Sequence, residues 1–467
     1  MSFSCRQFGF GPYCGLVPKR DGAFFRRGGV LVCHRGARVF LAPDGLGERV
    51  AVMARYACRF FLKPHIAEWK AVLLRLCAWF VRKWNRRPIW LVSDRSDRAD
   101  DNGRALFEYI SALPRSEVPA RCIFAIDRNC PDYEAMKGVG EVVDMSGWWY
   151  KVLFLASDFI ISAYRTKAQR MPFGARTVDF LSGFFARRYR FVCLRHGISQ
   201  NDQADDLGRH RLNARLLISA TRLEYDSILG GRYGYGAREV KLCGMTRYDK
   251  LYDAPSGCIT IMPTWRSYLT AGAGTNMLLS RETFAGGDFC LNYRGLLSDG
   301  DFIKACVAKG FRVRLMMHPN MRDSIGELNV SPLMEILPPE TSYRDVFATS
   351  DLVVTDYSSV AFDFAYLKKP VVYFQFDREK FFGAQYKAGY FDVERDGFGE
   401  VETDLAALKR RVLEYAEGGC RMKDEYRARV DRFFAFTDKD NCKRVYEAIL
   451  KADAEDRART SPCYSRA

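Results

Sequence analysis

The sequence lacks several features that would define its class at once. It has no run of about 20 uncharged apolar residues, which a membrane-spanning helix requires, and no long apolar core at its N-terminus. None of its 15 cysteines forms a Cys-x-x-Cys pair, and no Asp-x-Asp pair stands out as a site for a diphosphate-bound metal. These absences favour a cytoplasmic protein with reduced, mostly buried thiols, no membrane span and no evident cofactor. A requirement for a divalent metal stays open.

Length and composition indicate a globular protein of more than one domain. The 467 residues exceed what one hydrophobic core normally serves, and the chain is 48% hydrophobic and 14% aromatic. It contains no internal repeat and no low-complexity segment. Extended disorder and a single small fold are therefore excluded.

Acidic residues are scarce near one end of the chain. The first 90 residues hold 17 Lys and Arg against 4 Asp and Glu, which accounts for 13 of the 16 net positive charges. A basic surface attracts nucleic acid or an anionic membrane, but the remainder of this chain is close to neutral. We therefore expect a local accessory surface and no nucleic-acid-binding groove in the main fold.

Residues 49–87 alternate apolar and basic side chains, and Pro64 divides them into two helical pieces. The second piece has apolar residues three and four positions apart, with Trp69, Trp79 and Phe80 on or near that face. One interpretation places this helix in the headgroup layer of an anionic inner leaflet. The other packs it on the main body with a solvated basic face.

From Pro88 onward, short β-rich apolar runs alternate with helical segments, a pattern typical of parallel α/β domains. Strands are predicted at residues 89–92, 122–126, 159–162, 189–194, 216–219, 240–242, 259–262, 312–317, 352–355 and 371–374. The fold class is therefore α/β, with two Rossmann-like domains facing a cleft.

The predicted organisation has four parts. A basic amphipathic helical segment covers residues 1–87, one Rossmann-like domain covers 88–254 and a second covers 255–420. Charged helices and a tail cover 421–467, and the tail is expected to fray from Asp453 onward.

Polar and basic residues directly follow four of the predicted strands, where tandem α/β domains place their ligand. They are Arg195 and His196, Thr264 and Arg266, His318, and the run from Thr355 to Ser359. A histidine moves a proton or donates to phosphate, an arginine offers a forked donor set, and serines at a helix start favour an anion. Each also has a structural alternative: a histidine packed in the core, a surface ion pair, or a helix cap.

Six motifs occur in order between about residue 89 and about residue 402. They include Arg195-His196-Gly197, Gly244-Met245-Thr246-Arg247-Tyr248-Asp249, Met262-Pro263-Thr264-Trp265-Arg266, His318-Pro319 and Thr355-Asp356-Tyr357-Ser358-Ser359. Together they resemble the CDP-glycerol glycerophosphotransferase family, the bacterial polymerases and primases of teichoic acids and capsules. The resemblance implies a GT-B-like fold. It also implies transfer of glycerol phosphate or ribitol phosphate from a CDP-polyol to a hydroxyl of a lipid-linked acceptor, with release of CMP.

The resemblance also implies roles for single residues. His196 would be the general base for the acceptor hydroxyl, and His318 would hold the donor phosphates and steady the leaving group. The residues expected to bind substrate are Arg195, Thr264, Arg266, Thr355, Asp356, Ser358, Ser359 and Asp363. The loop Arg195-His196-Gly197-Ile198-Ser199-Gln200 departs from members that have Trp before His and Thr-Pro after Gly, which leaves the acceptor open.

The expected partners are CDP-glycerol or CDP-ribitol, a lipid-linked polymer or primer, and an anionic inner-leaflet membrane through residues 49–87. The enzyme would then act as a peripheral protein at the cytoplasmic face of the cell membrane. Two alternatives remain: a nucleotide-sugar glycosyltransferase of the same fold, and a non-enzymatic protein that binds membranes or polyanions.

Overall fold

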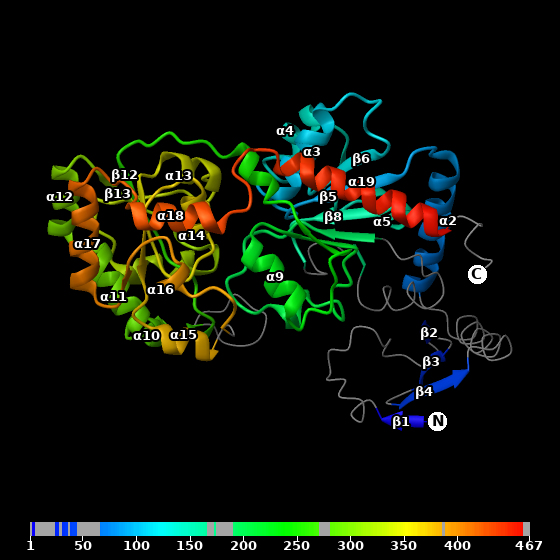
Figure 1. Cartoon of the computed structure of the whole chain (residues 1–467), viewed down its shortest axis with the longest axis horizontal. Coiled ribbons are helices and arrows are strands. Elements are labelled where there is room, and N and C mark those ends of the chain that lie inside the picture. The colour runs from blue at the N-terminus through cyan, green and yellow to red at the C-terminus, as the bar shows by residue number, and fades with distance from the viewer. Residues whose placement is uncertain are drawn as a thin grey trace.

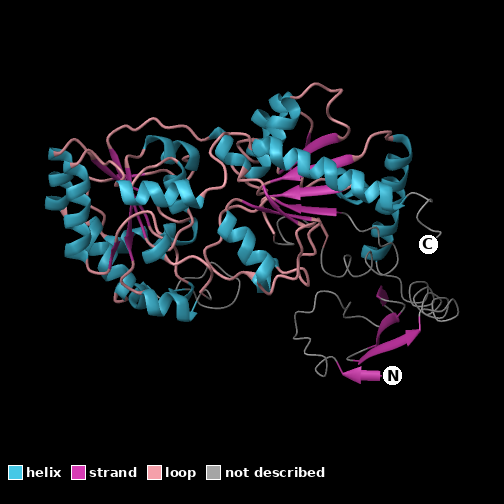
Figure 2. Cartoon of the chain, in the orientation of Figure 1, coloured by secondary structure: helices cyan, strands magenta, loops and turns pink. Residues whose placement is uncertain are grey.

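The structure is a computed structural model of the chain. It describes residues 66–165, 172–173, 190–269, 281–384 and 388–460, together with four short strands within residues 2–43. In this part of the chain, two α/β domains lie side by side, and the strands of each sheet run between covering helices (Figures 1 and 2).

The first domain contains a seven-stranded sheet in the order β11-β10-β9-β8-β5-β6-β7, with every described pairing parallel. Its strands are β5 (Ile89–Ser93), β6 (Arg121–Ile126), β7 (Val142–Asp144), β8 (Phe159–Ser162), β9 (Arg190–Cys193), β10 (Leu216–Ser219) and β11 (Val240–Leu242). Ile89 and Leu91 of β5 pack in one core cluster, and Trp90 and Val92 pack in the other. Both faces of the sheet are therefore buried, as its continuous apolar runs predict.

The second domain repeats this architecture with a six-stranded parallel sheet in the order β14-β13-β12-β15-β16-β17. The strands are β12 (Cys258–Met262), β13 (Arg312–Leu315), β14 (Glu335–Ile336), β15 (Leu352–Thr355), β16 (Val371–Phe374) and β17 (Val401–Glu402). All ten predicted strands are thus confirmed, whereas β7, β14 and β17 are additional. These three have only two or three residues each and so offer little periodic signal, although the equally short β11 was predicted.

Helices cover both faces of the two sheets. Those of the first domain are α2 (Ile66–Trp84), α3 (Asn102–Ala112), α4 (Tyr133–Val139), α5 (Trp148–Ala156), α8 (Ala204–Leu207), α9 (Arg222–Gly230) and the 3₁₀ turn η2 (Thr246–Lys250). Those of the second begin with η3 (Ser267–Leu269), α10 (Arg281–Ala285), α11 (Asp288–Leu297), α12 (Gly300–Ala308), η4 (Pro319–Leu328) and α13 (Tyr343–Thr349). The remaining elements are α14 (Val360–Tyr366), α15 (Arg378–Ala384), α16 (Val393–Asp396), α17 (Leu405–Glu417), α18 (Asp424–Phe433) and α19 (Asn441–Thr460).

The last helix returns to the first domain. Figure 1 shows α19 in red across that domain, close to α3 and β5. Tyr446 lies 5.9 Å from the ring of Trp90, and Ile449 is fully buried in the same core cluster. Helix α18 instead packs in a cluster made mostly of second-domain residues, which also contains Met245, Tyr248 and Leu251 of the first domain. The expectation of a tail frayed from Asp453 is wrong as far as Thr460, because Asp453 is buried against Arg190 at 2.8 Å.

The basic N-terminal segment is only partly helical. The short strands β1 (Ser2–Ser4), β2 (Phe24–Arg27), β3 (Val30–Arg35) and β4 (Arg38–Pro43) form an antiparallel sheet in the order β1-β4-β3-β2, which the sequence interpretation did not anticipate. The first of the two predicted helical pieces lies outside the described residues. The second is α2, and no helix in the described ranges is long and apolar enough to cross a bilayer.

Helix α2 has apolar side chains on two faces, and the larger of these side chains face outward. Small and branched side chains of α2 pack toward α5 and the core: Ala71, Leu74, Ala78 and Val81. Six larger ones are 44–79% exposed: Trp69, Leu73, Leu76, Trp79, Phe80 and Trp84. The helix therefore packs on the main body, as one interpretation expected, and it also presents an exposed apolar surface. Its placement in a headgroup layer stays a prediction.

Candidate active site

The carboxyl ends of the two sheets meet at a cavity of about 200 Å³. Among the residues expected from the sequence, six line it: Arg195, His196, Thr264, His318, Ser358 and Ser359. The first two come from the loop after β9 and the others from loops after β12, β13 and β15. The strand-end rule for tandem α/β domains therefore brings residues from four loops to one place.

The loop that carries His196 is held by a buried ion pair. The guanidinium of Arg195 lies 2.7 Å from the Glu224 carboxylate and also donates to the Ser199 hydroxyl. Arg195 has a φ of 64°, in the left-handed region that a non-glycine residue adopts only when its surroundings impose it. Asn102 donates to the Arg195 carbonyl at 2.7 Å. Because its charge is already paired, Arg195 fixes the shape of the loop.

His196 meets the cavity with its imidazole stacked on Tyr164, with 5.4 Å between ring centroids and 7° between planes. Enclosure by the protein, and then the cations Arg165, Arg247 and Arg195, lower its pKa to about 4. The residue is nevertheless solvent-exposed, so its ring is accessible from the cavity. A neutral imidazole at pH 7 is able to accept a proton.

His318 faces the same cavity from the second domain. Burial lowers its pKa to about 4, with Arg322 and Arg95 acting in the same direction and Asp356 opposing them. Its Nδ1 accepts a hydrogen bond from the Asn320 backbone N–H at 3.2 Å. In the neutral ring this leaves the proton on Nε2, which makes that atom a donor.

Four of the predicted binding residues lie behind the cavity wall. The guanidinium of Arg266 is 0% exposed and lies 2.9 Å from Asp356 and 2.7 Å from Asp377. Asp356 also accepts from the Thr264 backbone N–H at 3.0 Å. Thr355 donates to the Met262 carbonyl. The sequence interpretation expected the guanidinium of Arg266 to face the cavity, and this is wrong. In the structure the guanidinium instead fixes the loop that carries Thr264.

The fourth, Asp363, belongs to a contact between the domains that the sequence interpretation missed. Arg247 lies 2.7 Å from Asp363 of α14 and 3.1 Å from Asp101, and it donates to the His196 carbonyl at 2.7 Å. One guanidinium thus connects the histidine loop to the helix that follows Ser358 and Ser359.

Two further contacts join the lobes at this point. Gln200 donates to the Tyr357 carbonyl at 2.5 Å. A Cβ on Gly197 would lie 3.0 Å from the Ser359 hydroxyl, so the two loops are in close contact.

Some missed residues had a readable signal. Tyr164 and Arg165 follow β8 as His196 follows β9, so the strand-end rule applied to every strand would have found them. Glu224 had none, because it lies within α9 and only the fold brings it to Arg195. In the described ranges, no group of three His, Cys, Asp or Glu side chains is placed to hold a metal ion.

The chain is similar in sequence to known proteins. The profile of the CDP-Glycerol:Poly(glycerophosphate) glycerophosphotransferase family matches residues 74–451. The minor teichoic acid biosynthesis protein GgaB of Bacillus subtilis is 33% identical over 387 residues, which cover 82% of this chain and 42% of GgaB. A teichoic acid poly(glycerol phosphate) polymerase of Bacillus spizizenii is 24% identical over 194 residues, 41% of this chain and 44% of that protein. The chain therefore spans less than half the length of these curated relatives.

The fold is shared with a solved structure. The wall teichoic acid polymerase TagF superposes with a TM-score of 0.60 over 89% of this chain and 100% of that one, at 16% identity. The expected α/β fold of two Rossmann-like domains is confirmed by this match and by the two parallel sheets.

Proposed function

The chain belongs to the CDP-glycerol:poly(glycerophosphate) glycerophosphotransferase family, and on that premise we propose that it transfers glycerol phosphate from CDP-glycerol to an acceptor hydroxyl. The observation that carries the proposal is the cavity in which His196 of one domain meets His318, Ser358 and Ser359 of the other. A TagF variant soaked with CDPG is among the solved structures of the same fold, which supports a cytidine diphosphate donor.

In the proposed reaction the acceptor oxygen attacks the phosphorus that carries the glycerol. The bond from that phosphorus to the bridging oxygen breaks, and CMP leaves with the electron pair. His196 takes the acceptor proton, a task for which its neutral ring and its exposure to the cavity suit it. General base catalysis contributes about 10²–10⁴-fold to such a step.

Donors from the second domain stabilise the phosphates. His318, with its proton on Nε2, donates to a phosphate oxygen at the leaving group. Ser358 and Ser359 line the cavity and offer hydroxyls to the pyrophosphate, while Thr264 stands beside them. Arg266, Thr355 and Asp356 act through the position of these loops, since preorganised donors stabilise developing charge without reorganisation.

The acceptor is proposed to be a lipid-linked teichoic acid or capsule-type polymer, which brings the enzyme to the cytoplasmic face of the cell membrane as a peripheral protein. The outward apolar face of α2 supports this, because such surfaces mark interaction sites. Basic residues on the same helix suit anionic lipid.

The donor test compares CDP-glycerol, CDP-ribitol and a UDP-sugar with the purified full chain, by CMP or UDP release and by product mass. Transfer of a ribitol phosphate would change the substrate, and sugar transfer would favour the glycosyltransferase alternative. Absence of release from all three would favour a binding protein without enzymatic activity. His196→Ala and His318→Ala should each lower turnover by about 10²-fold or more, while His210→Ala, on the exposed surface, serves as the matched control.

The membrane test uses sedimentation with phosphatidylglycerol vesicles. The double variant Leu73→Ser and Leu76→Ser removes two side chains that are 60% and 52% exposed on α2. It should weaken vesicle binding about tenfold or more, because each buried leucine contributes roughly 1.5–3 kcal/mol. Leu291→Ser with Leu333→Ser, which are equally exposed in the second domain, provides the control. Equal sedimentation of both double variants would contradict a role of α2.

A further inference from the structure

A second and larger cavity lies at the opposite edge of the first domain's sheet. It has a volume of about 430 Å³. Its walls come from the C-terminal end of α2, from the residues at which β5, β8 and β9 begin, and from the last turns of α19. The strands between the two edges have four or five residues, which at about 3.3 Å per residue separates this cavity from the catalytic one by about 13–17 Å or more.

The lining of this cavity, here called the basal cavity, is strongly charged. It contains five arginines against three aspartates: Arg82, Arg86, Arg87, Arg190 and Arg457, with Asp158, Asp453 and Asp456. Positive charge is therefore in excess. Burial, and then the charge of Arg82 about two turns further along α2, lower the pKa of Arg75.

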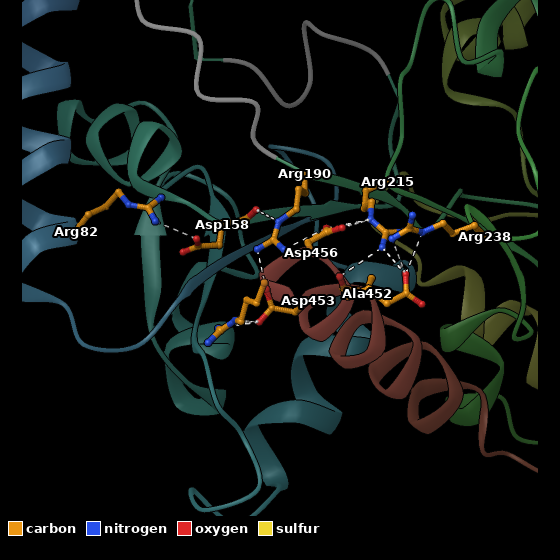
Figure 3. A network of polar contacts seen from close by, with 10 residues as sticks. Arg82, Asp158, Arg190, Arg215, Arg238, Ala452, Asp453 and Asp456 are labelled. Atoms are coloured by element: carbon orange, nitrogen blue, oxygen red, sulfur yellow. Dashed lines mark hydrogen bonds and ion pairs between the residues drawn. The ribbon is translucent and has the colours of Figure 1, made fainter. Parts of the chain in front are cut away.

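Most of these groups are held in place by one another. Figure 3 shows a row of polar contacts from Arg82 toward Arg215. Arg82 forms an ion pair with Asp158, and Arg190 donates to the Asp158 backbone carbonyl. Asp456 then forms ion pairs with both Arg190 and Arg215. Among these charged side chains Asp453 is the most deeply buried, at 5% exposure. A ligand would thus meet a preorganised set of donors and acceptors, which lowers the cost of binding.

Two of the five guanidiniums do not face a carboxylate. Within the described chain, Arg87 donates to the Val118 carbonyl, and Arg86 is exposed with no ion-pair partner. Arginine forks suit the oxygens of a phosphodiester. Aspartates in the same cavity suit hydroxyl groups, since an ionised carboxylate only accepts hydrogen bonds.

We propose that the basal cavity binds a segment of polyol-phosphate chain, in which phosphodiesters and hydroxyls alternate. The inference rests on the proposed function, which makes such a chain the acceptor and the product. The enzyme then holds already formed polymer at one edge of the sheet while its end is extended at the other.

The orientation of α2 favours polymer over a lipid headgroup. At 100° per residue, the exposed residues Leu73, Phe80 and Trp84 lie about 160–180° from Arg82 around α2, whereas the exposed Trp79 lies about 60° from it. A membrane under Leu73, Phe80 and Trp84 is therefore on the far side of the helix from Arg82, which leaves the basal cavity open to a chain in the surrounding water.

The experiment measures binding of a lipid-free glycerol phosphate hexamer to the full chain by calorimetry at low salt. Arg86→Glu should weaken hexamer binding about tenfold or more, because it reverses one exposed cation beside a polyanion. The same change at Arg410, exposed on α17 of the second domain, should leave the affinity within about twofold. Equal affinities of the two variants would overturn the proposal.

Two further binding measurements identify the occupant, and one activity measurement serves as a control. In one outcome, Arg86→Glu weakens binding to phosphatidylglycerol vesicles but not to the hexamer. This would show that a lipid headgroup occupies the cavity and would overturn the proposal. An RNA hexamer that binds wild type as tightly as the polyol phosphate, with the same sensitivity to Arg86→Glu, would also overturn it. CMP release is measured separately on wild type, so that failure of the proposed function is distinguished from failure of this site.

Discussion

Arg247 offers the sharpest test of how the site is built. Its guanidinium lies 2.7 Å from Asp363 and 3.1 Å from Asp101, and it donates to the His196 carbonyl. The Asp363 side chain is 2% exposed and that of Asp101 9%. Arg247→Met therefore leaves two buried carboxylates without their cation. Removing one partner of a buried ion pair costs about 3–5 kcal/mol, equivalent to a fall in melting temperature of roughly 6–20 °C for a domain of this size.

The loss should depend on pH in a defined direction. Burial raises the pKa of Asp101 to about 6 and also raises that of Asp363, while Arg247 opposes both shifts. Without Arg247 both pKa values rise further. A buried acid whose pKa is raised in the folded state is tolerated there while it is protonated. It destabilises the folded state as pH rises through that pKa, because it then becomes charged. Arg247→Met should therefore be nearly harmless at pH 4 and most destabilising above pH 6–7.

Two companion variants separate stability from catalysis. Arg247→Met combined with Asp363→Asn should recover part of the lost free energy of unfolding, because one unpaired charge is gone. Arg247→Lys keeps the charge but loses the fork, so it should fold and yet lower kcat by about 10²-fold through misplacement of His196. Urea unfolding and CMP release give these values. A free energy of unfolding for Arg247→Met within 1 kcal/mol of wild type across pH 4–8, or wild-type kcat for Arg247→Lys, would refute the reasoning.

Three further changes probe other parts of the molecule. Gly197→Ala places a methyl 3.0 Å from the Ser359 hydroxyl across the cleft, so it should lower kcat with little loss of stability. The control Gly138→Ala, with nothing within 4 Å, should leave kcat unchanged, and equal kcat for the two variants would contradict the close contact. Ile449→Ala should cost about 2–5 kcal/mol in urea unfolding, because this α19 side chain is fully buried in the first domain; a loss below 1 kcal/mol would show that α19 is not docked. Arg165→Gln removes one of the cations that lower the pKa of His196, so the acidic limb of the kcat/KM profile should move upward toward pH 6.5; an unmoved limb would argue against His196 as the base.

Much of the fold was readable because the signal is local. A parallel strand buried on both faces, such as β5, is a continuous apolar run, and the residues after it lie at a known edge of the sheet. His196 and His318 could therefore be placed in one cavity from their positions after strands alone. The frayed tail was a wrong prediction because α19 is stabilised by distant partners, among them Trp90 and Arg190, which its own charged sequence does not reveal.

Roles that depend on pairing could not be read in the same way. Arg266 and Arg247 each follow a strand in a motif, yet Arg266 is fully buried and paired with two carboxylates, and Arg247 links the two domains. Whether an arginine faces substrate or a carboxylate depends on which acids the fold brings beside it. In this chain those acids, Asp377 and Asp363, lie 111 and 116 residues away.

The contacts that position His196 also hold the two domains together, and this limits how substrate enters. The candidate active-site cavity of about 200 Å³ is smaller than the roughly 300–1,000 Å³ of small-molecule sites. The proposed donor, CDP-glycerol, therefore either extends beyond it or requires the domains to separate. Separation would break the Arg247 contact with Asp363 and the Gln200 contact with Tyr357, and it would withdraw the proposed base from Ser358 and Ser359. The loop of His196 is consequently held beside Ser358 and Ser359 only while these contacts between the domains are made.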